Sequence, residues 1–459
     1  MKSAGLSIAA VTAAAIAAGT LPAAATDGYF QNGYGARQKA LAGAGVADGK
    51  DATSASLNPA GLIHAEDQLN IAVSVFSPRR SFEATGSLLF PEGETESGTD
   101  YFAIPNLAYS TRAYANPLFD VVGLTVYGNG GLNTDYKDGA NAKCGNPALP
   151  FFGLNPPTGT GPLCDGEFGV NLQQMLISVA FAKEIMPGLS VGVAPILVQQ
   201  KIEVEGLDLF AGLSNTGAAS GNGNNSAWGG GVRYGVEWAP MSTVRLGVAG
   251  NTRLWTEPFS EYKGLFAENG DFDIPASIQA GIAVDVTRQL TLMVDYKHIW
   301  YGSVDSIANP QSGLLTCFGQ GGTRFGANPN CLGGENGPGF GWKDIDVIKV
   351  GAEYRATEAL TLRAGYSWTQ GPIEESDVFF NTLAPATPTH HITGGLKYDI
   401  DQNYSVELAG MYAPNQSIEG VDPLVQAFGG RSSVEIEMYQ FEVTGGLVYR
   451  WGAPAAPLK

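Results

Sequence analysis

Segments of about 10 to 14 residues in which apolar and polar side chains alternate recur along the chain. In the last of them the alternation runs from Tyr439 to Trp451, and the clearest earlier ones are 228–238, 290–297 and 360–369. A period of two places alternate side chains on opposite faces of a β-strand. The chain is therefore expected to consist of strands that have one apolar and one polar face.

The length of these segments favours a membrane barrel over a soluble β-sandwich, whose strands also alternate. Soluble strands usually have about 5 to 6 residues, whereas a tilted membrane-crossing strand needs about 9 to 11. Tyr and Trp also cluster at the ends of the apolar faces, where the aromatic girdle of a barrel lies. The apolar face would contact outer-membrane lipid, and the charged face would point into the lumen. The charged residues expected in the lumen are Arg233, Glu237, Asp295, Lys297, Arg363, Glu407 and Arg450.

The connections between these segments alternate in length. Short turns occur near residues 115–117, 186–188, 239–241, 287–288, 357–358 and 401–403. Long polar or glycine-rich loops cover residues 131–170, 204–226, 256–275, 301–343, 372–388 and 414–433. This alternation is typical of an outer-membrane barrel with periplasmic turns and extracellular loops. Residues 69–451 are therefore predicted to form an all-β, transmembrane antiparallel β-barrel of about 14 strands, an even number as in bacterial barrels.

The two ends of the chain fall outside the predicted barrel. A positive Lys2, an Ala-rich apolar stretch over 6–21 and an Ala-x-Ala site at 23–25 predict a signal peptide over residues 1–25. The alternative is an N-terminal membrane anchor, which the weakly hydrophobic alanine core disfavours. Residues 452–459 follow the last strand as a C-terminal tail. After the signal peptide no run of about 18 apolar residues occurs, so we expect no spanning helix and a location in the bacterial outer membrane.

Residues 26–68 lack strand alternation and are rich in small side chains, as in 33–36, 40–45 and 58–62. A segment of this length ahead of the first strand lies either inside the lumen or in the periplasm. Small residues allow the close backbone approach that a confined space demands. We therefore expect a plug in the lumen, called the hatch below, with a periplasmic tail as the alternative.

The charge and the cysteines restrict the partners. The formal net charge is −18 at pH 7, and phosphate backbones would repel such a surface, so we expect no nucleic-acid partner. The four cysteines fall into two local pairs, Cys144 with Cys164 and Cys317 with Cys331, within loops rich in Gly, Pro and Asn. Of the three possible connectivities, only the local one requires no distant loops to meet, so we predict two disulfides. A four-thiolate metal site is the alternative, but neither pair has C-x₂-C spacing.

The polar residues do not predict catalysis. No Ser lies in a nucleophile-elbow sequence, and the four histidines lack the partners of a Ser–His pair or a metal site. We therefore expect no enzyme activity, no metal and no cofactor.

The segment before the barrel resembles a known family. The residues that carry the resemblance are Tyr29-Phe30, the run from Gly43 through Gly45 and Ala47 to Asp48, Asp51-Ala52 and Asn58-Pro59-Ala60. Followed by a barrel, they look like the FadL/TodX (OmpP1) family, outer-membrane transporters of long-chain fatty acids and other hydrophobic compounds. Residues 191–195 leading to 205–207 are similar to the family's fifth strand and third loop. The tail beyond Trp451 departs from the pattern of barrels that end on an aromatic residue.

The resemblance implies passive uptake. Ligand is caught between the third and fourth outside loops and enters the barrel. It leaves after the hatch shifts, often sideways through an opening at a kinked strand. The expected hatch residues are Tyr29, Phe30, Asn58, Pro59 and Ala60, with Asn58 placed to hydrogen-bond a strand backbone and Pro59 fixing a turn.

The two loops carry apolar residues that support a capture site. The candidates are Leu207, Leu209, Phe210, Leu213, Trp255, Phe259, Tyr262, Leu265 and Phe266. If the fourth loop formed a helix, Phe259, Tyr262 and Phe266 would share one face. Exposed apolar surface on an outside loop is costly unless it binds something. The alternative is that these residues only pack the two loops on each other.

The sequence is compatible with two classes of ligand. Long-chain fatty acid is the default and aromatic hydrocarbon the alternative, because both fit an apolar pocket. A carboxylate could pair with a lumen arginine such as Arg233, Arg245 or Arg253. Pro195 inside a strand predicts a kink or bulge there. A general porin and a surface adhesin are further alternatives, and we expect a monomer.

Overall fold

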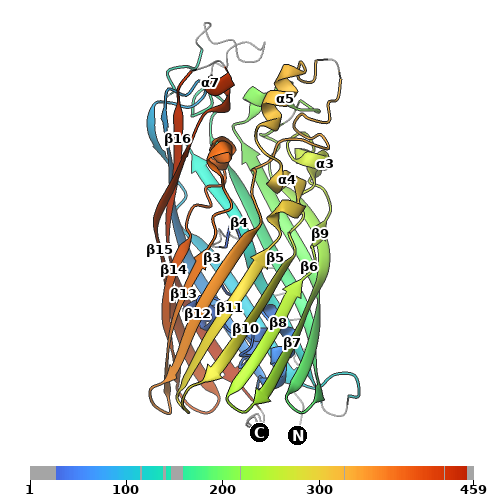
Figure 1. Ribbon diagram of the computed structural model, residues 1–459, viewed down its shortest axis with the longest axis vertical. Coiled ribbons are helices and arrows are strands. Elements are labelled where there is room, and N and C mark those ends of the chain that lie inside the picture. The colour runs from blue at the N-terminus through green and yellow to red at the C-terminus, as the bar shows by residue number, and fades with distance from the viewer. Residues whose placement is uncertain are drawn as a thin grey trace.

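The computed structural model describes residues 27–113, 116–137, 141–145, 159–217, 219–324, 326–427 and 430–451. Within these residues the chain forms one sheet of 16 strands, in which β16 also pairs with β1 and closes a barrel (Figure 1). Two strands are short additions: β2 (Gly93–Glu96) pairs with β1, and β9 (Trp255–Thr256) pairs with β7.

The other 14 strands (16 less 2) form the wall, each antiparallel to its neighbours. They are β1 (Gln68–Thr85), β3 (Phe102–Arg112), β4 (Val121–Tyr136), β5 (Phe168–Met186), β6 (Leu189–Glu205), β7 (Asn225–Met241), β8 (Val244–Asn251), β10 (Ser277–Asp285), β11 (Leu290–Ile299), β12 (Ile345–Arg355), β13 (Leu360–Thr369), β14 (His390–Asp399), β15 (Tyr404–Gly420) and β16 (Ser433–Arg450). The predicted barrel and its number of strands are confirmed.

The wall strands turn their apolar side chains outward. In β1, Ile71, Val73 and Val75 are 44–50% exposed, whereas the residues between them are buried. Polar and small side chains therefore fill the interior, which reverses the arrangement of a soluble protein and suits a lipid-facing wall. Among the described residues, no helix is both long enough and apolar enough to cross a membrane.

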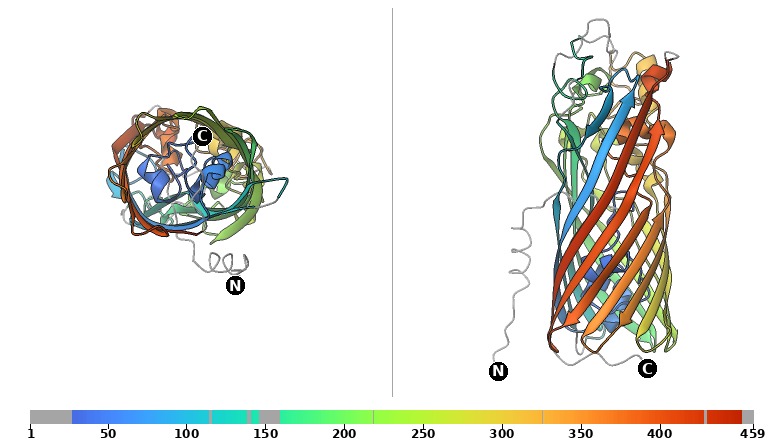
Figure 2. Two further views of the ribbon diagram at one scale, coloured as in Figure 1. Left: turned by 90° about the horizontal axis from the view of Figure 1, so that it is seen from below. Right: turned by 90° about the vertical axis from the view of Figure 1, so that its left-hand side faces the viewer.

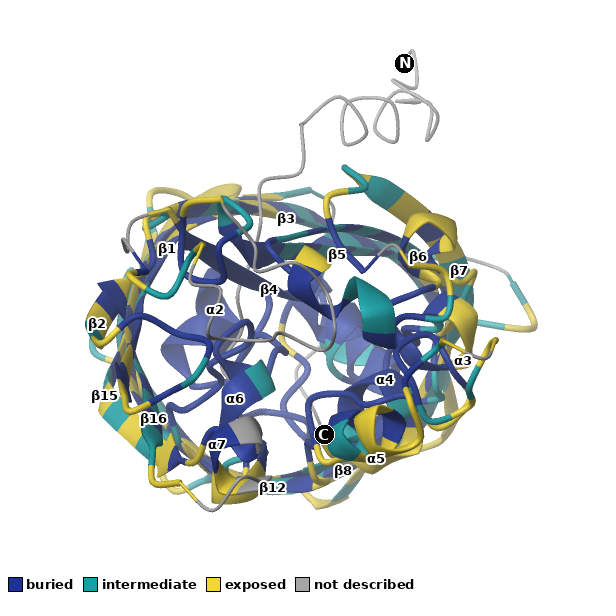
Figure 3. Cartoon of the chain, turned by 90° about the horizontal axis from the view of Figure 1, so that it is seen from above, coloured by how far each residue is buried: buried dark blue, intermediate teal, exposed yellow. Residues whose placement is uncertain are grey.

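The long connections all lie at one end of the barrel, opposite the short turns (Figure 1). We number them loop 1 (86–101), loop 2 (137–167), loop 3 (206–224), loop 4 (252–276), loop 5 (300–344), loop 6 (370–389) and loop 7 (421–432). Their helices are η3 (Asp208–Leu213), η4 (Ser260–Tyr262), α3 (Ala267–Gly270), η5 (Tyr301–Ser303), α4 (Asp305–Ala308), α5 (Gly313–Gly319), η6 (Glu375–Asp377), α6 (Val378–Asn381) and α7 (Pro423–Ala427). Seen from above, several of these helices partly cover the barrel mouth (Figure 3).

Two predicted loop boundaries were wrong. Residues 131–136, expected in a loop, continue β4, and residues 414–420 continue β15. The pairing of Ser417 with Glu437 and of Glu419 with Glu435 shows the reason. At these strand ends the polar side chains lie on the outer face and apolar ones such as Ile436 are buried inside. The strands therefore remain paired, although their pattern no longer has its apolar side outward.

The hatch lies inside the barrel, toward the end with the short turns (Figure 2). Its helices α2 (Gly35–Ala40) and η1 (Ala52–Ser56) are buried throughout, and η2 (Pro59–His64) is largely buried. Small residues are required here, because a Cβ on Gly49 would lie 2.3 Å from the Cα of Gly61. The predicted lumen plug is confirmed. The predicted signal peptide and C-terminal tail lie outside the described residues.

Ion pairs attach the hatch to the wall. Arg37 pairs with Asp48 of the hatch (2.6 Å) and with Glu353 of β12 (3.0 Å). Arg245 of β8 reaches the same Asp48 (2.7 Å), and Arg363 of β13 reaches the same Glu353 (2.9 Å). Because these side chains are largely buried, each charge depends on its partners, and the network holds the hatch in one position.

Candidate functional site

An apolar cavity, the mouth pocket, lies among the long loops. It is a narrow cavity of about 40 Å³. The lining comes from β5, β6 and loops 3 to 6: Val170, Val204, Leu207, Phe210, Leu265, Phe266, Ser306, Leu332, Pro338, Gly339, Phe340, Phe380 and Leu383. Such a lining suits an apolar ligand.

The structure brings some of the expected capture residues to this pocket and not others. Four of them line it: Leu207, Phe210, Leu265 and Phe266. Four more are buried in the apolar core around it: Leu209, Leu213, Phe259 and Tyr262. Trp255 lies outside the pocket and is 59% exposed. Sequence reasoning missed the contributions of loops 5 and 6.

Loop 4 does not form the helix that would have aligned its aromatic residues. Only Ser260–Tyr262 and Ala267–Gly270 are helical, and Glu268 and Asn269 have φ of 54° and 61°. The aromatic rings meet nonetheless: the Phe266 ring lies 6.3 Å from Phe259, 6.3 Å from Tyr262 and 5.0 Å from Phe272. Packing against the other loops, rather than helical spacing, gathers them.

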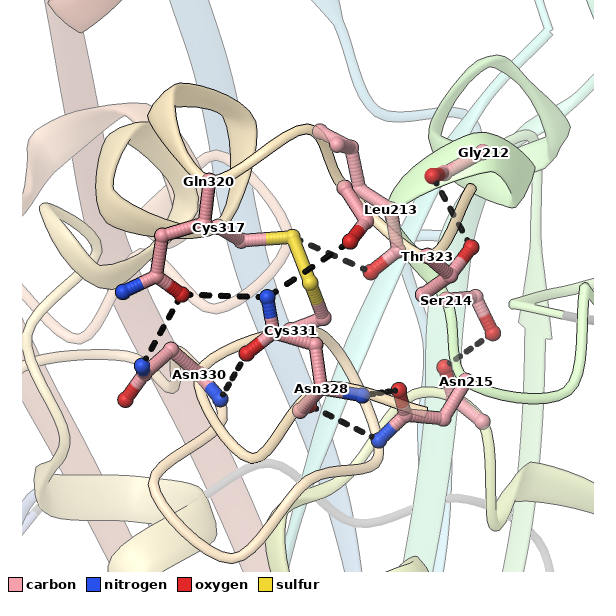
Figure 4. The surroundings of a disulfide bond; sticks show 12 residues. Gly212, Leu213, Ser214, Asn215, Cys317, Gln320, Thr323, Asn328, Asn330 and Cys331 are labelled. Carbon is pink, nitrogen blue, oxygen red and sulfur yellow. Dashed lines mark hydrogen bonds between the residues drawn. A yellow bond between two sulfur atoms is a disulfide. The ribbon is translucent and has the colours of Figure 1, made fainter. Parts of the chain in front are cut away.

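Loop 5 is fastened to loop 3 beside a disulfide (Figure 4). The structure joins Cys317 to Cys331 and, in loop 2, Cys144 to Cys164. Next to Cys331, the Leu332 N–H donates to the Leu213 carbonyl (2.9 Å), and the Asn215 N–H donates to the Leu332 carbonyl (3.0 Å). The disulfide therefore constrains a loop that holds η3, and with it one side of the mouth pocket.

An aromatic cluster separates the mouth pocket from the hatch. Phe340 of the pocket lies 6.3 Å from Trp342, which lies 5.1 Å from Tyr301. Tyr301 lies 5.3 Å from Tyr29 and 5.7 Å from Phe30, ring centre to ring centre. The expected hatch residues Tyr29 and Phe30 thus lie directly below the pocket.

The barrel wall is incomplete beside Tyr29 and Phe30. Within the described residues, β3 and β4 are paired only from Asn106–Tyr127 to Arg112–Val121. Beyond Tyr127, β4 bulges at Asn129, and residues 102–105 of β3 pair with β1 alone. Pro105 of β3 has no backbone N–H to offer the missing ladder. We call the unpaired stretch between residues 102–105 of β3 and the part of β4 beyond Tyr127 the wall break.

The hatch occupies the wall break in place of β3. The Gln31 N–H donates to the Asn129 carbonyl (2.9 Å), and the Gly131 N–H donates to the Tyr29 carbonyl (3.2 Å). The Gln31 side chain also donates to the Gly128 carbonyl (2.9 Å). The backbone groups that the bulge exposes are therefore satisfied by hatch residues 29–31.

The Asn-Pro-Ala tripeptide fixes the hatch at a different place. Asn58 donates to the carbonyls of Val46 (2.7 Å) and of Val236 in β7 (3.2 Å), and its side-chain oxygen accepts from the Ala60 N–H (3.0 Å). Pro59 is the first residue of η2. This contact lies away from the wall break, so it is an anchor.

Pro195 interrupts the β5–β6 ladder without a bulge. No pairs join Val179 and Ala180 to Pro195 and Ala194, but the pairs on either side, such as Ser178–Ile196, keep the same register. The irregular strand beside the hatch segment is therefore β4.

The three lumen arginines differ in their partners. Arg245 pairs with Asp48 and Asp285, and Arg253 pairs with Asp271 and Asp273. Arg233 is 5% exposed and makes no ion pair within the described residues. It donates to the Tyr127 hydroxyl (2.7 Å) and lies 5.8 Å from the centre of that ring. Because Tyr127 is the last β4 residue paired with β3, Arg233 lies at the rim of the wall break.

No group of three or more His, Cys, Asp and Glu side chains in the described ranges is placed to hold a metal ion. The described site is made of apolar and aromatic groups with one buried arginine, a lining that suits the binding of an apolar ligand.

Comparison with known proteins identifies the family. The family model described as outer membrane protein transport protein (OMPP1/FadL/TodX) matches residues 166–422. The chain belongs to this family. Members of the FadL/TodX family are channels of the bacterial outer membrane for hydrophobic compounds, and this protein is such a channel.

Solved structures share the fold of this FadL/TodX member. The P. putida toluene transporter TodX is 17% identical, with a TM-score of 0.63 over 92% of this chain and 99% of that one. A Pseudomonas aeruginosa FadL homologue is 14% identical, with a TM-score of 0.64 over 93% and 100%. The Ralstonia pickettii toluene transporter TbuX is 17% identical, with a TM-score of 0.59 over 92% and 99%. A search of curated proteins finds no match.

Proposed function

We propose that this FadL/TodX member takes up long-chain fatty acids passively. The acyl chain enters the mouth pocket, the carboxylate reaches Arg233, and the ligand leaves sideways through the wall break once hatch residues 29–31 withdraw. The observation that carries the proposal is the spatial order of three features: an apolar pocket, then an aromatic cluster, then a break in the wall that the hatch closes.

The mouth pocket supports capture. Apart from Ser306 its residues are apolar, and most of them come from loops and short helices, which move more readily than strands. An acyl chain can therefore insert by separating side chains that are held together only by packing. Phe210 and Phe266 face the pocket from loops 3 and 4. Trp255 lies outside, so we leave it out of the proposed site.

Arg233 supports an acidic ligand. A buried guanidinium without a carboxylate partner costs several kcal/mol in desolvation, and its neighbour Tyr127 supplies only a neutral oxygen. A fatty-acid carboxylate would add the charge-assisted hydrogen bonds that this arginine lacks. Arg245 and Arg253 are already neutralised by aspartates and are poorer candidates.

The ion pairs of the hatch support a sideways exit. A path straight toward the periplasmic end would cross the network of Arg37, Asp48, Glu353 and Arg363, which an acyl chain cannot solvate. At the wall break three hydrogen bonds join hatch residues 29–31 to β4, and the Tyr34 hydroxyl adds a fourth from the hatch to Asn129; all four join neutral groups. An apolar molecule that passes through the wall reaches lipid, in which it is stable.

Aromatic hydrocarbon is the second candidate, and the cluster of Tyr29, Phe30, Tyr301 and Trp342 favours it. Stacked and edge-to-face rings could hold a planar ligand on its way to the break. The toluene transporters that share the fold bear this activity in their names. This reading leaves the unpaired Arg233 without a role.

The capture step is tested with Phe266→Asp, which places a charge in the mouth pocket. Trp255→Asp is the matched control, because it adds the same charge to the same loop outside the pocket. We expect uptake of radiolabelled oleate by cells to fall at least about tenfold for Phe266→Asp, since a charge in an apolar site costs over 1.4 kcal/mol, and to stay unchanged for the control. Unchanged uptake in a correctly inserted Phe266→Asp barrel would refute the capture site.

A further inference from the structure

A row of buried polar side chains crosses the lumen face of three adjacent strands beside the wall break. The Tyr34 hydroxyl donates to the Asn129 side-chain oxygen (3.0 Å), and the Asn129 amide donates to the Gln174 side-chain oxygen (3.0 Å). The Gln174 amide donates to the Gln200 side-chain oxygen (2.8 Å). All four side chains are buried. We call Asn129, Gln174 and Gln200 the amide ladder.

One end of the amide ladder reaches the mouth pocket. The Gln200 amide donates to the Phe272 carbonyl (2.8 Å) and to the Thr256 hydroxyl (3.0 Å), both in loop 4. The Phe272 ring lies 5.0 Å from Phe266, which lines the pocket. A ligand that displaces the Phe266 ring therefore presses on the residue whose carbonyl ends the ladder.

The other end reaches the hatch. Asn129 is the bulged residue of β4, and its carbonyl accepts the hydrogen bond from Gln31 that holds the hatch in the wall break. Its side-chain oxygen accepts from Tyr34, another hatch residue. Both contacts depend on the position of Asn129, which is fixed on its third side by Gln174.

The direction of the hydrogen bonds makes the ladder act as a unit. In each amide the oxygen accepts from the preceding residue and the NH₂ donates to the next. A buried amide that loses its partner is strongly disfavoured, so a shift of Phe272 has to be followed along the row or break it. Gln174 and Gln200 are paired directly across β5 and β6, so one side chain has little room to move without the other.

We propose that Gln174 and Gln200 are positioning residues that couple occupancy of the mouth pocket to release of hatch residues 29–31 from the wall break. With the pocket empty, loop 4 holds the ladder, the ladder holds Asn129, and Asn129 holds the hatch. Ligand between the loops moves Phe272, the Gln200 amide loses the Phe272 carbonyl as an acceptor, and the hatch segment is freed. This inference rests on the proposed function.

The test is amide hydrogen exchange of the full-length folded barrel in detergent, with and without sodium oleate. In the wild type, oleate should raise exchange about tenfold, a usual size for coupling between two sites, at the amides of Gln31 and Gly131. The variant Gln174→Leu with Gln200→Leu should still bind oleate but lose this response. The single variant Gln200→Met removes the bonds of Gln200 to loop 4 and to Gln174. It should also lose the response, and it replaces the double variant if that does not fold.

The matched control removes a different buried hydrogen bond from β4 and β5. Thr125 and Ser178 are hydrogen-bonded (2.7 Å) across these strands, outside the ladder. Thr125→Val with Ser178→Ala should keep the full response to oleate. Equal loss of the response in this control, or its survival in the ladder variants, would overturn the inference.

The same data separate this inference from the proposed function. Binding of oleate to the wild type without faster exchange at Gln31 and Gly131 refutes the coupling alone. If oleate does not bind to the wild type, the proposed function fails and the coupling fails with it. Loss of oleate binding in the ladder variants, with the control intact, would also contradict the proposal, because the ladder would then belong to the binding site.

Discussion

Replacing Gly130 with alanine should free the hatch from the wall break. A Cβ added at Gly130 would lie 1.9 Å from the Tyr29 carbonyl oxygen, far inside the contact distance of any two atoms. Either the hatch segment or the β4 bulge must therefore move. β4 pairs with β5 on both sides of the bulge, so the hatch segment is the part that yields.

The magnitude follows from the hydrogen bonds that separate. They join the Gln31 N–H to Asn129 (2.9 Å), the Gly131 N–H to Tyr29 (3.2 Å) and the Gln31 side chain to Gly128 (2.9 Å). A typical hydrogen bond contributes about 1 kcal/mol net. Loss of all three destabilises the closed position by about 3 kcal/mol, which raises the open population about a hundredfold.

The assay is oleate uptake in cells, supported by hydrogen exchange at the Gln31 amide in the purified barrel. Gly445→Ala is the control, because it adds the same methyl group to the wall strand β16 where no atom lies within 4 Å. We expect faster uptake and faster exchange at Gln31 for Gly130→Ala and wild-type behaviour for Gly445→Ala. If Gly130→Ala inserts correctly and remains as closed as the wild type, the hatch does not seal the wall break.

Three further predictions address the loops and the arginine. Cys317→Ser with Cys331→Ser removes a disulfide of sequence separation 14, which should destabilise loop 5 by about 3 kcal/mol. Oleate binding should weaken while the barrel still migrates as a folded band on a gel. Unchanged affinity for oleate would show that the disulfide does not support the pocket. Arg233→Gln should weaken oleate binding about tenfold, the loss expected for one charge-assisted hydrogen bond, and leave methyl oleate unaffected; equal loss for both ligands would contradict a headgroup role. Burial, reinforced by the neighbouring Asp273, raises the pKa of Asp271 from 3.8 to about 6. The folded loop 4 therefore favours the protonated carboxyl, and its resistance to protease should fall as pH rises through this interval, a dependence that Asp271→Asn should abolish.

The sequence predicts the wall well because the residue types along each strand depend directly on whether a side chain faces lipid or the lumen. In β1 the outward side chains are Ile71, Val73 and Val75, and the residues between them face the lumen. The amino-acid sequence therefore alternates with a period of two. The hatch was also predictable, since residues such as Gly49 and Gly61 approach too closely for any side chain. The predicted boundaries were wrong where the strands extend toward the loops and polar side chains such as Glu435 and Glu437 take the outer face, while Val434 and Ile436 are buried inside.

The ligand path was less predictable because its parts come from distant segments. Tyr301 and Trp342 meet Tyr29 across more than half of the chain, and no local pattern encodes such contacts. The helix expected around Phe259 is absent because packing, not helical spacing, assembles the loop. The wall break did leave a signal, since the glycines around Asn129 inside an alternating strand are typical of a bulge. That Arg233 lacks an acid, unlike Arg245 and Arg253, only the assembled lumen shows.

The most direct test of the proposed uptake function is a binding titration of the purified, folded barrel followed by tryptophan fluorescence, with oleate and then toluene. Trp342 lies between the mouth pocket and the hatch, so its emission should respond to ligand on the proposed path. We predict saturable binding of oleate that Arg233→Gln weakens, and weaker or no binding of toluene. Saturable binding of toluene alone, or of neither compound, would contradict uptake of fatty acids by this channel.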